Sequence, residues 1–166
     1  EMCIRDSYSH LAAVSIDPDA EIIPCKTFDD CFNKASEEPD CRVIIPESNR
    51  ITGNIGIEYL IFKHRLNIYQ EHFQKIEHNL LGQPGSKLSD IKEVYSHAQG
   101  LSQCSNFIKE NNIAEHIRAD TAGSAEMISK TKDKKQAAIA SSLSAEIYNL
   151  DIIKKNIENE SGNLTR

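Results

Sequence analysis

Short apolar runs alternate with stretches of helical periodicity along this chain, and this rhythm is the strongest constraint on its fold. The rhythm is clearest in the second half, where we expect strands near residues 93–96, 115–118 and 137–140 and helices over 99–111, 121–130 and 142–148. Such alternation is typical of proteins in which helices cover the faces of a largely parallel sheet. The sequence therefore predicts an α/β fold.

The first half repeats the pattern less regularly. We expect helices over residues 8–16, from after Thr27 to about 37, and over 53–63, and short strands over 21–25 and 42–46. Thr27 stands where an N-cap residue is needed, directly before the second of these helices. The run at 42–46 is apolar and ends at a proline, which indicates a buried strand followed by a loop.

Residues 66–81 form a longer stretch with partial alternation, long enough to cross from one lobe into another. Ile152 and Ile153 begin a return path. We therefore expect one domain over residues 1–166 with two lobes, lobe 1 at about 8–70 and 150–166 and lobe 2 at about 71–149. A site is expected in a cleft between them, where strand ends and helix starts meet, from the loops at 46–53, 96–99, 120–123 and Ser141.

Composition excludes several classes of function. The formal net charge is −6 and no long Lys/Arg cluster occurs, which argues against nucleic-acid binding. No apolar run has the length of a membrane span, and residues 1–7 lack the apolar core of a signal peptide. An odd number of cysteines without a C-x-x-C pair argues against disulfides and a zinc site, and indicates the cytoplasm; they are Cys3, Cys25, Cys31, Cys41 and Cys104.

Several polar residues near the expected loops have two readings each. Asn49 offers amide donors, or forms an ordinary Asx turn. Thr121 opens a helix whose first N–H groups could bind a carboxylate, or is simply its N-cap; both can hold together. His97 follows a strand and is more often a structural hydrogen-bonding residue than an acid or base. Cys104 is expected to be a small buried hydrophobe.

Five segments carry more specific patterns. They are Tyr8-Ser9-His10-Leu11-Ala12-Ala13, Tyr95-Ser96-His97-Ala98-Gln99, Asp120-Thr121-Ala122-Gly123-Ser124-Ala125, Ala138-Ile139-Ala140-Ser141 and Asn163-Leu164-Thr165-Arg166. In this order and spacing they resemble motifs of the prephenate dehydratase catalytic domain, with Ala98 in the place of the usual proline. The resemblance extends from Tyr8 to Arg166.

This resemblance implies a two-lobed fold similar to type 2 periplasmic binding proteins. It implies a lyase that converts prephenate to phenylpyruvate in L-phenylalanine biosynthesis by losing carbon dioxide and the ring hydroxyl, without cofactor or metal. Thr165 is implied as the catalytic proton donor. The residues implied in substrate binding are Asn49, Ser96, Gln103, Thr121, Ala122, Gly123 and Arg166. Arg166 would hold a carboxylate or brace its own motif, and the full-length protein is expected to be a homodimer or homotetramer.

The chain departs from the family pattern in two places. The family usually has Pro-x-Glu-Asn, whereas this chain has Pro46-Glu47-Ser48-Asn49, so either Glu47 supplies the carboxylate or that role is absent. Residues 1–7 do not resemble the family's start and are interpreted as foreign or mis-assembled sequence. The chain also stops before the expected closing strand and regulatory ACT domain, as in a fragment. The alternatives are a non-catalytic module that binds a small anionic solute, and an inactive fragment of the enzyme.

Overall fold

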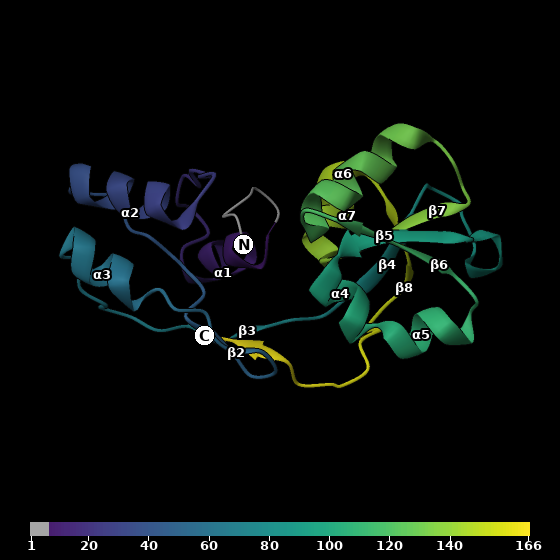
Figure 1. Ribbon diagram of the computed structural model, residues 1–166. Helices are drawn as coiled ribbons and strands as arrows, with labels where there is room; N and C mark the ends of the chain where they lie inside the picture. Colours follow the sequence, from purple (N-terminus) through teal and green to yellow (C-terminus); the bar gives the residue numbers. More distant parts are fainter. Residues whose placement is uncertain (1–6) are drawn as a thin grey trace. The chain divides into compact units, whose positions relative to one another are not determined.

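The computed structural model describes residues 7–166, which form two compact units. The first contains the described residues up to Ile76 together with Asn163–Arg166, and the second is Glu77–Gly162. Each unit has helices and a sheet of its own, which confirms the predicted α/β class (Figure 1). The interpretation of residues 1–7 as foreign sequence lies outside the described residues except at Ser7, whose hydroxyl caps the first helix.

The second unit is built on a five-stranded sheet of order β6-β5-β7-β4-β8. Parallel pairing joins β5 to β6 and β7, whereas β4 runs antiparallel to both β7 and β8. The strands are β4 (Asn79–Gly82), β5 (Glu93–His97), β6 (Ala114–Arg118), β7 (Gln136–Ala140) and β8 (Asp151–Lys154). The predicted strands near 93–96, 115–118 and 137–140 are therefore confirmed.

Helices cover both faces of this sheet, α4 and α5 on one and α6 and α7 on the other (Figure 1). They are α4 (Ala98–Gln103), α5 (Ser105–Glu110), α6 (Thr121–Thr131) and α7 (Ser142–Tyr148), and a 3-10 turn, η1, spans Leu88–Asp90. Because successive strand residues point to opposite faces, Leu80 and Val94 enter the core beneath α4 and α5, and their neighbours Leu81 and Tyr95 enter the core beneath α6 and α7.

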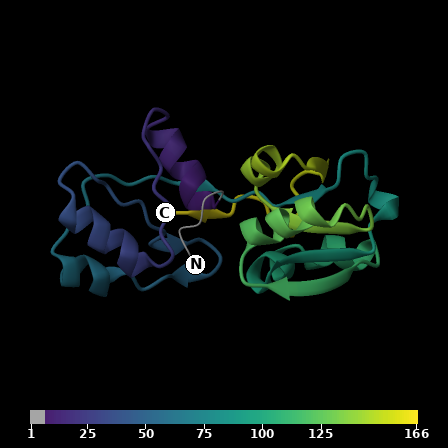
Figure 2. The ribbon, with the colours of Figure 1, turned by 90° about the horizontal axis from the view of Figure 1, so that it is seen from above.

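The first unit has three helices and a small antiparallel sheet of order β2-β1-β9-β3. Its elements are α1 (Tyr8–Ile16), α2 (Phe28–Glu37), β1 (Ser48–Asn49), β2 (Gly53–Asn54), α3 (Glu58–His64), β3 (Gln74–Lys75) and β9 (Leu164–Thr165). Thr27 caps α2 as predicted, in a capping box with Asp30. Helices α2 and α3 lie side by side (Figures 1 and 2), and Asp29 of α2 bonds Lys63 and His64 of α3.

Two predicted strands of the first half are wrong, and one predicted helix begins later than expected. Residues 21–25 and 42–46 are in neither sheet. An apolar run becomes a strand only where a neighbouring strand supplies hydrogen bonds, and composition does not reveal that neighbour. The helix expected from 53 begins at Glu58 instead, because Gly53 (φ 82°) and Gly56 (φ 79°) adopt left-handed backbone angles that a right-handed helix excludes.

Two predictions for the second half also need correction. The helix expected over 99–111 is two short helices, since the backbone at Cys104 (φ −113°, ψ 14°) leaves helical geometry. The return path expected at Ile152 and Ile153 lies within β8, which pairs with β4 and completes the sheet of the second unit. The boundary predicted near residue 150 is therefore placed too early, and the chain re-enters the first unit at Asn163.

Within residues 7–166, no helix is both long and apolar enough to cross a membrane.

Cys104 illustrates how completely the core of the second unit excludes water. Its thiol is fully buried, and this burial raises its pKa to about 12. Because the thiolate is the reactive form, we expect iodoacetamide to leave Cys104 unmodified in the native protein while the partly exposed Cys25 and Cys41 react. Peptide mass spectrometry before and after unfolding measures this; native labelling of Cys104 at the rate of Cys25 would contradict the burial.

Candidate active site

Asn49 and Thr165 are brought together by the sheet of the first unit, although 116 positions separate them in sequence. They are direct cross-strand partners in the antiparallel pair β1–β9. The pairing is fixed on both sides, because Arg50 N–H donates to the Leu164 carbonyl (2.9 Å) and Arg166 N–H donates to the Ser48 carbonyl (2.8 Å). Directly opposed residues of an antiparallel pair project from the same face, so the two side chains meet.

The Asn49 side chain is the centre of a buried hydrogen-bond network. Its Nδ2 group donates to the Thr165 hydroxyl oxygen (2.9 Å) and to Asn163 Oδ1 (2.8 Å). Its Oδ1 accepts from the backbone N–H groups of Ile51 (2.9 Å) and Thr52 (3.2 Å). Asn49 is 8% exposed and Asn163 is 3% exposed. Every hydrogen-bonding group of the Asn49 amide is thereby used inside the protein, so its orientation is fixed.

The direction of the Asn49–Thr165 bond has a chemical consequence. Because the amide nitrogen can only donate, the Thr165 oxygen must accept, and the hydroxyl proton points elsewhere. The Thr165 hydroxyl has no other hydrogen-bond partner among residues 7–166. A hydroxyl that accepts a hydrogen bond is polarised into a stronger donor. Thr165 therefore offers a free proton for a ligand oxygen.

Arg166 is engaged by carboxylates of its own unit. Its Nε donates to Glu71 (2.9 Å) and its guanidinium lies 3.5 Å from Glu47, whose carboxylate also accepts from the Ser48 hydroxyl (2.6 Å). The backbone of Glu47 donates to the Arg166 carbonyl (2.8 Å). Of the two roles expected for Arg166, these contacts favour bracing the Thr165 strand. They also bring the Glu47 carboxylate to Ser48, the position where the family carries glutamate.

In the second unit, the start of α6 contains the donors predicted from Thr121 to Gly123. Asp120, rather than Thr121, is the N-cap, and its carboxylate accepts the Gly123 N–H. That amide is therefore occupied, and we leave Gly123 out of the proposed donors. The N–H groups of Thr121 and Ala122 belong to the first turn, which has no intrahelical acceptors. With the half-buried Thr121 hydroxyl they form a set of uncharged donors.

Ser96 lies beside this helix start but is occupied. A methyl group added at Gly100 would come within 2.9 Å of Ser96 Oγ and 3.5 Å of the Thr121 side chain, so the three residues pack closely. Ser96 is fully buried and its hydroxyl donates to the Ile139 carbonyl (2.7 Å), which ties β5 to β7. This is a structural role, and Ser96 is omitted from the proposed site. His97 also acts structurally, as predicted, by capping α4 through Gln99 N–H (3.2 Å).

Gln103 lies at the end of α4, half-buried, and its side-chain carbonyl is 2.7 Å from Nε2 of His78. Sequence reasoning selected Gln103 but missed His78, which precedes β4 and is 3% exposed. The sequence feature that could have identified His78 is the pair His78-Asn79 directly before the apolar Leu80-Leu81. Polar residues at the start of a buried strand need hydrogen-bond partners. No group of three or more His, Cys, Asp or Glu side chains within residues 7–166 is placed to hold a metal ion.

The described residues define an α/β protein of two units, of which the first carries a polarised hydroxyl at Thr165 and the second a set of uncharged donors at the start of α6. The family model for prephenate dehydratase matches residues 4–166 of this chain. The chain therefore belongs to the prephenate dehydratase family.

Known proteins of this family and fold are similar over nearly the whole chain. Arogenate dehydratase/prephenate dehydratase 1, chloroplastic, of Arabidopsis thaliana is 38% identical over 164 residues, covering 98% of this chain and 42% of that protein. The solved structure of GqqA, described as a novel type of quorum quenching acylase, has a TM-score of 0.88 at 33% identity and covers 96% of this chain and 58% of that one.

The crystal structure of prephenate dehydratase from Arthrobacter aurescens, in complex with L-Phe, has a TM-score of 0.86 over 97% of this chain and 55% of that one. At 23% sequence identity, this similarity shows a shared fold and no more. The chain spans 42% of the length of the first curated relatives it matches, the Arabidopsis protein and arogenate dehydratase 2 of Petunia hybrida.

Proposed function

We propose that this chain catalyses the decarboxylative dehydration of prephenate to phenylpyruvate, with Thr165 as the proton donor to the departing hydroxyl. The observation that carries the proposal is the Asn49–Thr165 hydrogen bond of 2.9 Å, which leaves the Thr165 proton free. Membership of the prephenate dehydratase family supports the same reaction. A module that only binds a small anion would need donors, but no polarised hydroxyl held in one orientation.

The chemistry requires few groups. Loss of carbon dioxide and the ring hydroxyl leaves an aromatic ring, so the reaction is strongly downhill once the leaving oxygen is stabilised. The C–O bond breaks with its electron pair on oxygen while the electrons of the breaking C–C bond enter the ring. A positioned donor at the leaving oxygen therefore lowers the barrier. The threonine hydroxyl is a weak acid, so it acts through a short, aligned hydrogen bond or as part of a relay.

Binding of the substrate's two carboxylates is assigned to uncharged donors. The proposed donors are the Gln103 amide, the Thr121 hydroxyl and the N–H groups of Thr121 and Ala122. A helix start favours an anion because its N–H groups converge and its dipole is positive there. Asn49 acts by orienting Thr165, since its amide hydrogens are already donated within the protein. Arg166, braced by Glu47 and Glu71, holds the Thr165 strand in place.

The test is product formation from two candidate substrates. Incubation with prephenate should yield phenylpyruvate, and incubation with arogenate, which carries an amino group in place of the keto group, would yield phenylalanine. The names of the plant relatives include both substrates, so chromatography of the two reactions decides between them. Binding of both compounds without product would overturn the proposed lyase activity and favour a binding module.

The location of the protein and its assembly are proposed separately from the reaction. We place the activity in the cytoplasm because the described cysteines are free thiols, although the Arabidopsis relative is named as chloroplastic. The full-length protein is proposed to be a homodimer or homotetramer. Size-exclusion chromatography with light scattering measures the assembly, and cell fractionation measures the location.

A further inference from the structure

The Gln103 side chain needs an orienting partner if it is to bind an anion. Its amide carries an acceptor and a donor at equal distances from the backbone, and several rotatable bonds allow either to face a ligand. The NH2 group of the amide attracts a carboxylate, whereas the carbonyl oxygen of the amide repels it. A residue that binds only one end of the amide would decide which end is presented and would lower the entropy cost of binding.

His78 is placed to bind the carbonyl end. Its Nε2 lies 2.7 Å from Gln103 Oε1. Because a carbonyl oxygen only accepts, the hydrogen of this bond must be carried by His78 Nε2. His78 is 3% exposed, so its ring has little access to water as a hydrogen-bond partner. In the tautomer with its hydrogen on Nε2, the histidine holds the Gln103 amide with the carbonyl facing the ring.

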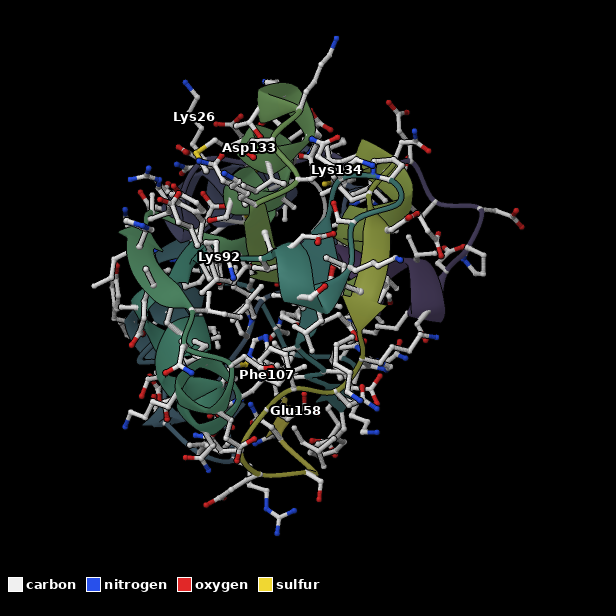
Figure 3. All side chains as sticks on the ribbon, turned by 90° about the vertical axis from the view of Figure 1, so that its right-hand side faces the viewer. Lys26, Lys92, Phe107, Asp133, Lys134 and Glu158 are labelled. Carbon is white, nitrogen blue, oxygen red and sulfur yellow. The ribbon has the colours of Figure 1, made fainter. Side chains whose placement is uncertain are left out.

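The backbone fixes both partners of this bond. His78 N–H donates to the Glu158 carboxylate (3.1 Å), and the His78 carbonyl accepts from Ile157 N–H (2.9 Å). Gln103 is held by the same segment, since its backbone carbonyl accepts from Asn159 N–H (2.7 Å). Figure 3 faces this part of the second unit, with Glu158 labelled near Phe107 and on the side opposite the turn at Asp133 and Lys134. His78 also directly precedes β4, the strand that lies between β7 and β8 in the sheet.

The other end of the Gln103 amide remains available. No acceptor within residues 7–166 is hydrogen-bonded to Gln103 Nε2. We propose that His78 is a positioning residue for the reaction: its Nε2–H holds the Gln103 carbonyl, so that the Gln103 NH2 group is presented to a carboxylate or hydroxyl oxygen of the substrate. The inference rests on the proposed function, in which Gln103 touches substrate and His78 acts only through it.

The first test replaces His78 by two residues of different hydrogen-bonding capacity. His78→Phe keeps an aromatic ring of similar size but removes the donor, and we expect kcat/KM to fall by about 10- to 100-fold because a misplaced binding group has an effect of that order. His78→Gln supplies a new N–H near the position of Nε2 and should recover much of this loss. Equal losses in both variants, at equal folded fractions, would overturn the proposal.

A matched control separates positioning from general destabilisation. His64 is also a histidine with a largely covered side chain (8% exposed), whose Nε2 is bonded to Asp29 (2.8 Å) and whose ring lies against Phe32 in the first unit. His64→Phe should lower the midpoint of thermal unfolding and leave kcat/KM of the folded protein unchanged. A loss of kcat/KM in this control as large as that of His78→Phe would attribute both effects to destabilisation and contradict positioning.

A double-mutant cycle gives the decisive readout. If His78 acts through Gln103, then His78→Phe should cause no further loss of kcat/KM in a Gln103→Met background. An undiminished loss in that background would assign His78 a role independent of Gln103 and overturn the inference. Failure of the proposed function itself is distinguishable, because the unmutated protein would then form no product from prephenate or arogenate.

Discussion

Replacement of Thr165 by Val should reduce turnover of prephenate by about a hundredfold to ten-thousandfold, the range expected for loss of a positioned proton donor. Valine keeps the branched shape that suits β9 and removes only the hydroxyl. Prephenate affinity should change little, because the donors assigned to the carboxylates remain. Steady-state assays of phenylpyruvate and calorimetric titration with prephenate separate the two quantities.

Two further measurements make this result specific to the hydroxyl. Thr165→Ser keeps the oxygen and should retain turnover within about tenfold, since the less restricted serine samples more rotamers. Thr165→Val also leaves an Asn49 N–H without its acceptor (2.9 Å in the native protein), which should lower the free energy of unfolding by about 1–3 kcal/mol. Turnover of the valine variant close to that of the native protein would remove Thr165 from the mechanism.

Replacement of Asn49 by Asp should cause a comparable loss, because it removes the amide donor to the Thr165 hydroxyl and to Asn163 Oδ1. The carboxylate accepts and cannot donate, so the Thr165 hydroxyl would turn its proton towards it and withdraw it from substrate. The backbone N–H groups of Ile51 and Thr52 would still find an acceptor. We expect turnover at neutral pH to fall by about a hundredfold or more, as measured by the initial rate of phenylpyruvate formation.

The pH dependence of this variant identifies the cause. As the pH falls and the introduced carboxyl group takes up a proton, it can again donate to Thr165, so part of the lost turnover should return after the uncatalysed rate is subtracted. The native protein, which has an amide at this position, serves as the reference over the same pH range. A variant whose deficit stays constant with pH would have lost activity through misfolding of β1 and β9 rather than through the direction of the bond.

The second unit was largely predictable because its elements are encoded locally. Strands β5 and β7 are five-residue segments whose central residues are buried, and α6 and α7 begin at polar capping residues, Asp120 and Ser141. These signals extend over a few positions and can be recognised without knowing which elements are adjacent in the fold. What local signals do not show is which strand lies beside which, and this is why Ile152 and Ile153 were assigned to a return path rather than to β8.

The first unit was harder because its sheet consists of strands of two residues. No periodicity can be recognised over so short a span, and the positive φ angles at Gly53 and Gly56 depend on the turn that joins β1 to α3. The apolar run at 42–46 met every local criterion of a strand and is still in neither sheet. Strand formation is decided by partners that are distant in sequence.

Of the predicted site, the pair Asn49 and Thr165 came from the resemblance to a family, since no local pattern joins residues 116 positions apart. Other residues predicted for the site have partners within the protein that the sequence does not reveal. Ser96 and the Gly123 amide are polar groups near the right loops, but protein acceptors, the Ile139 carbonyl and the Asp120 carboxylate, already occupy them. Which donors are free depends on contacts between residues that are distant in sequence.

A single-turnover experiment that measures carbon dioxide and phenylpyruvate together tests most directly whether the Thr165 hydroxyl drives the loss of both groups from prephenate. The native protein and Thr165→Val should both bind prephenate. We predict that the native protein releases the two products in equal amounts and at the same rate, and that the valine variant releases both about a hundredfold to ten-thousandfold more slowly. Prephenate bound by the native protein without either product, or equal rates from both proteins, would contradict this mechanism.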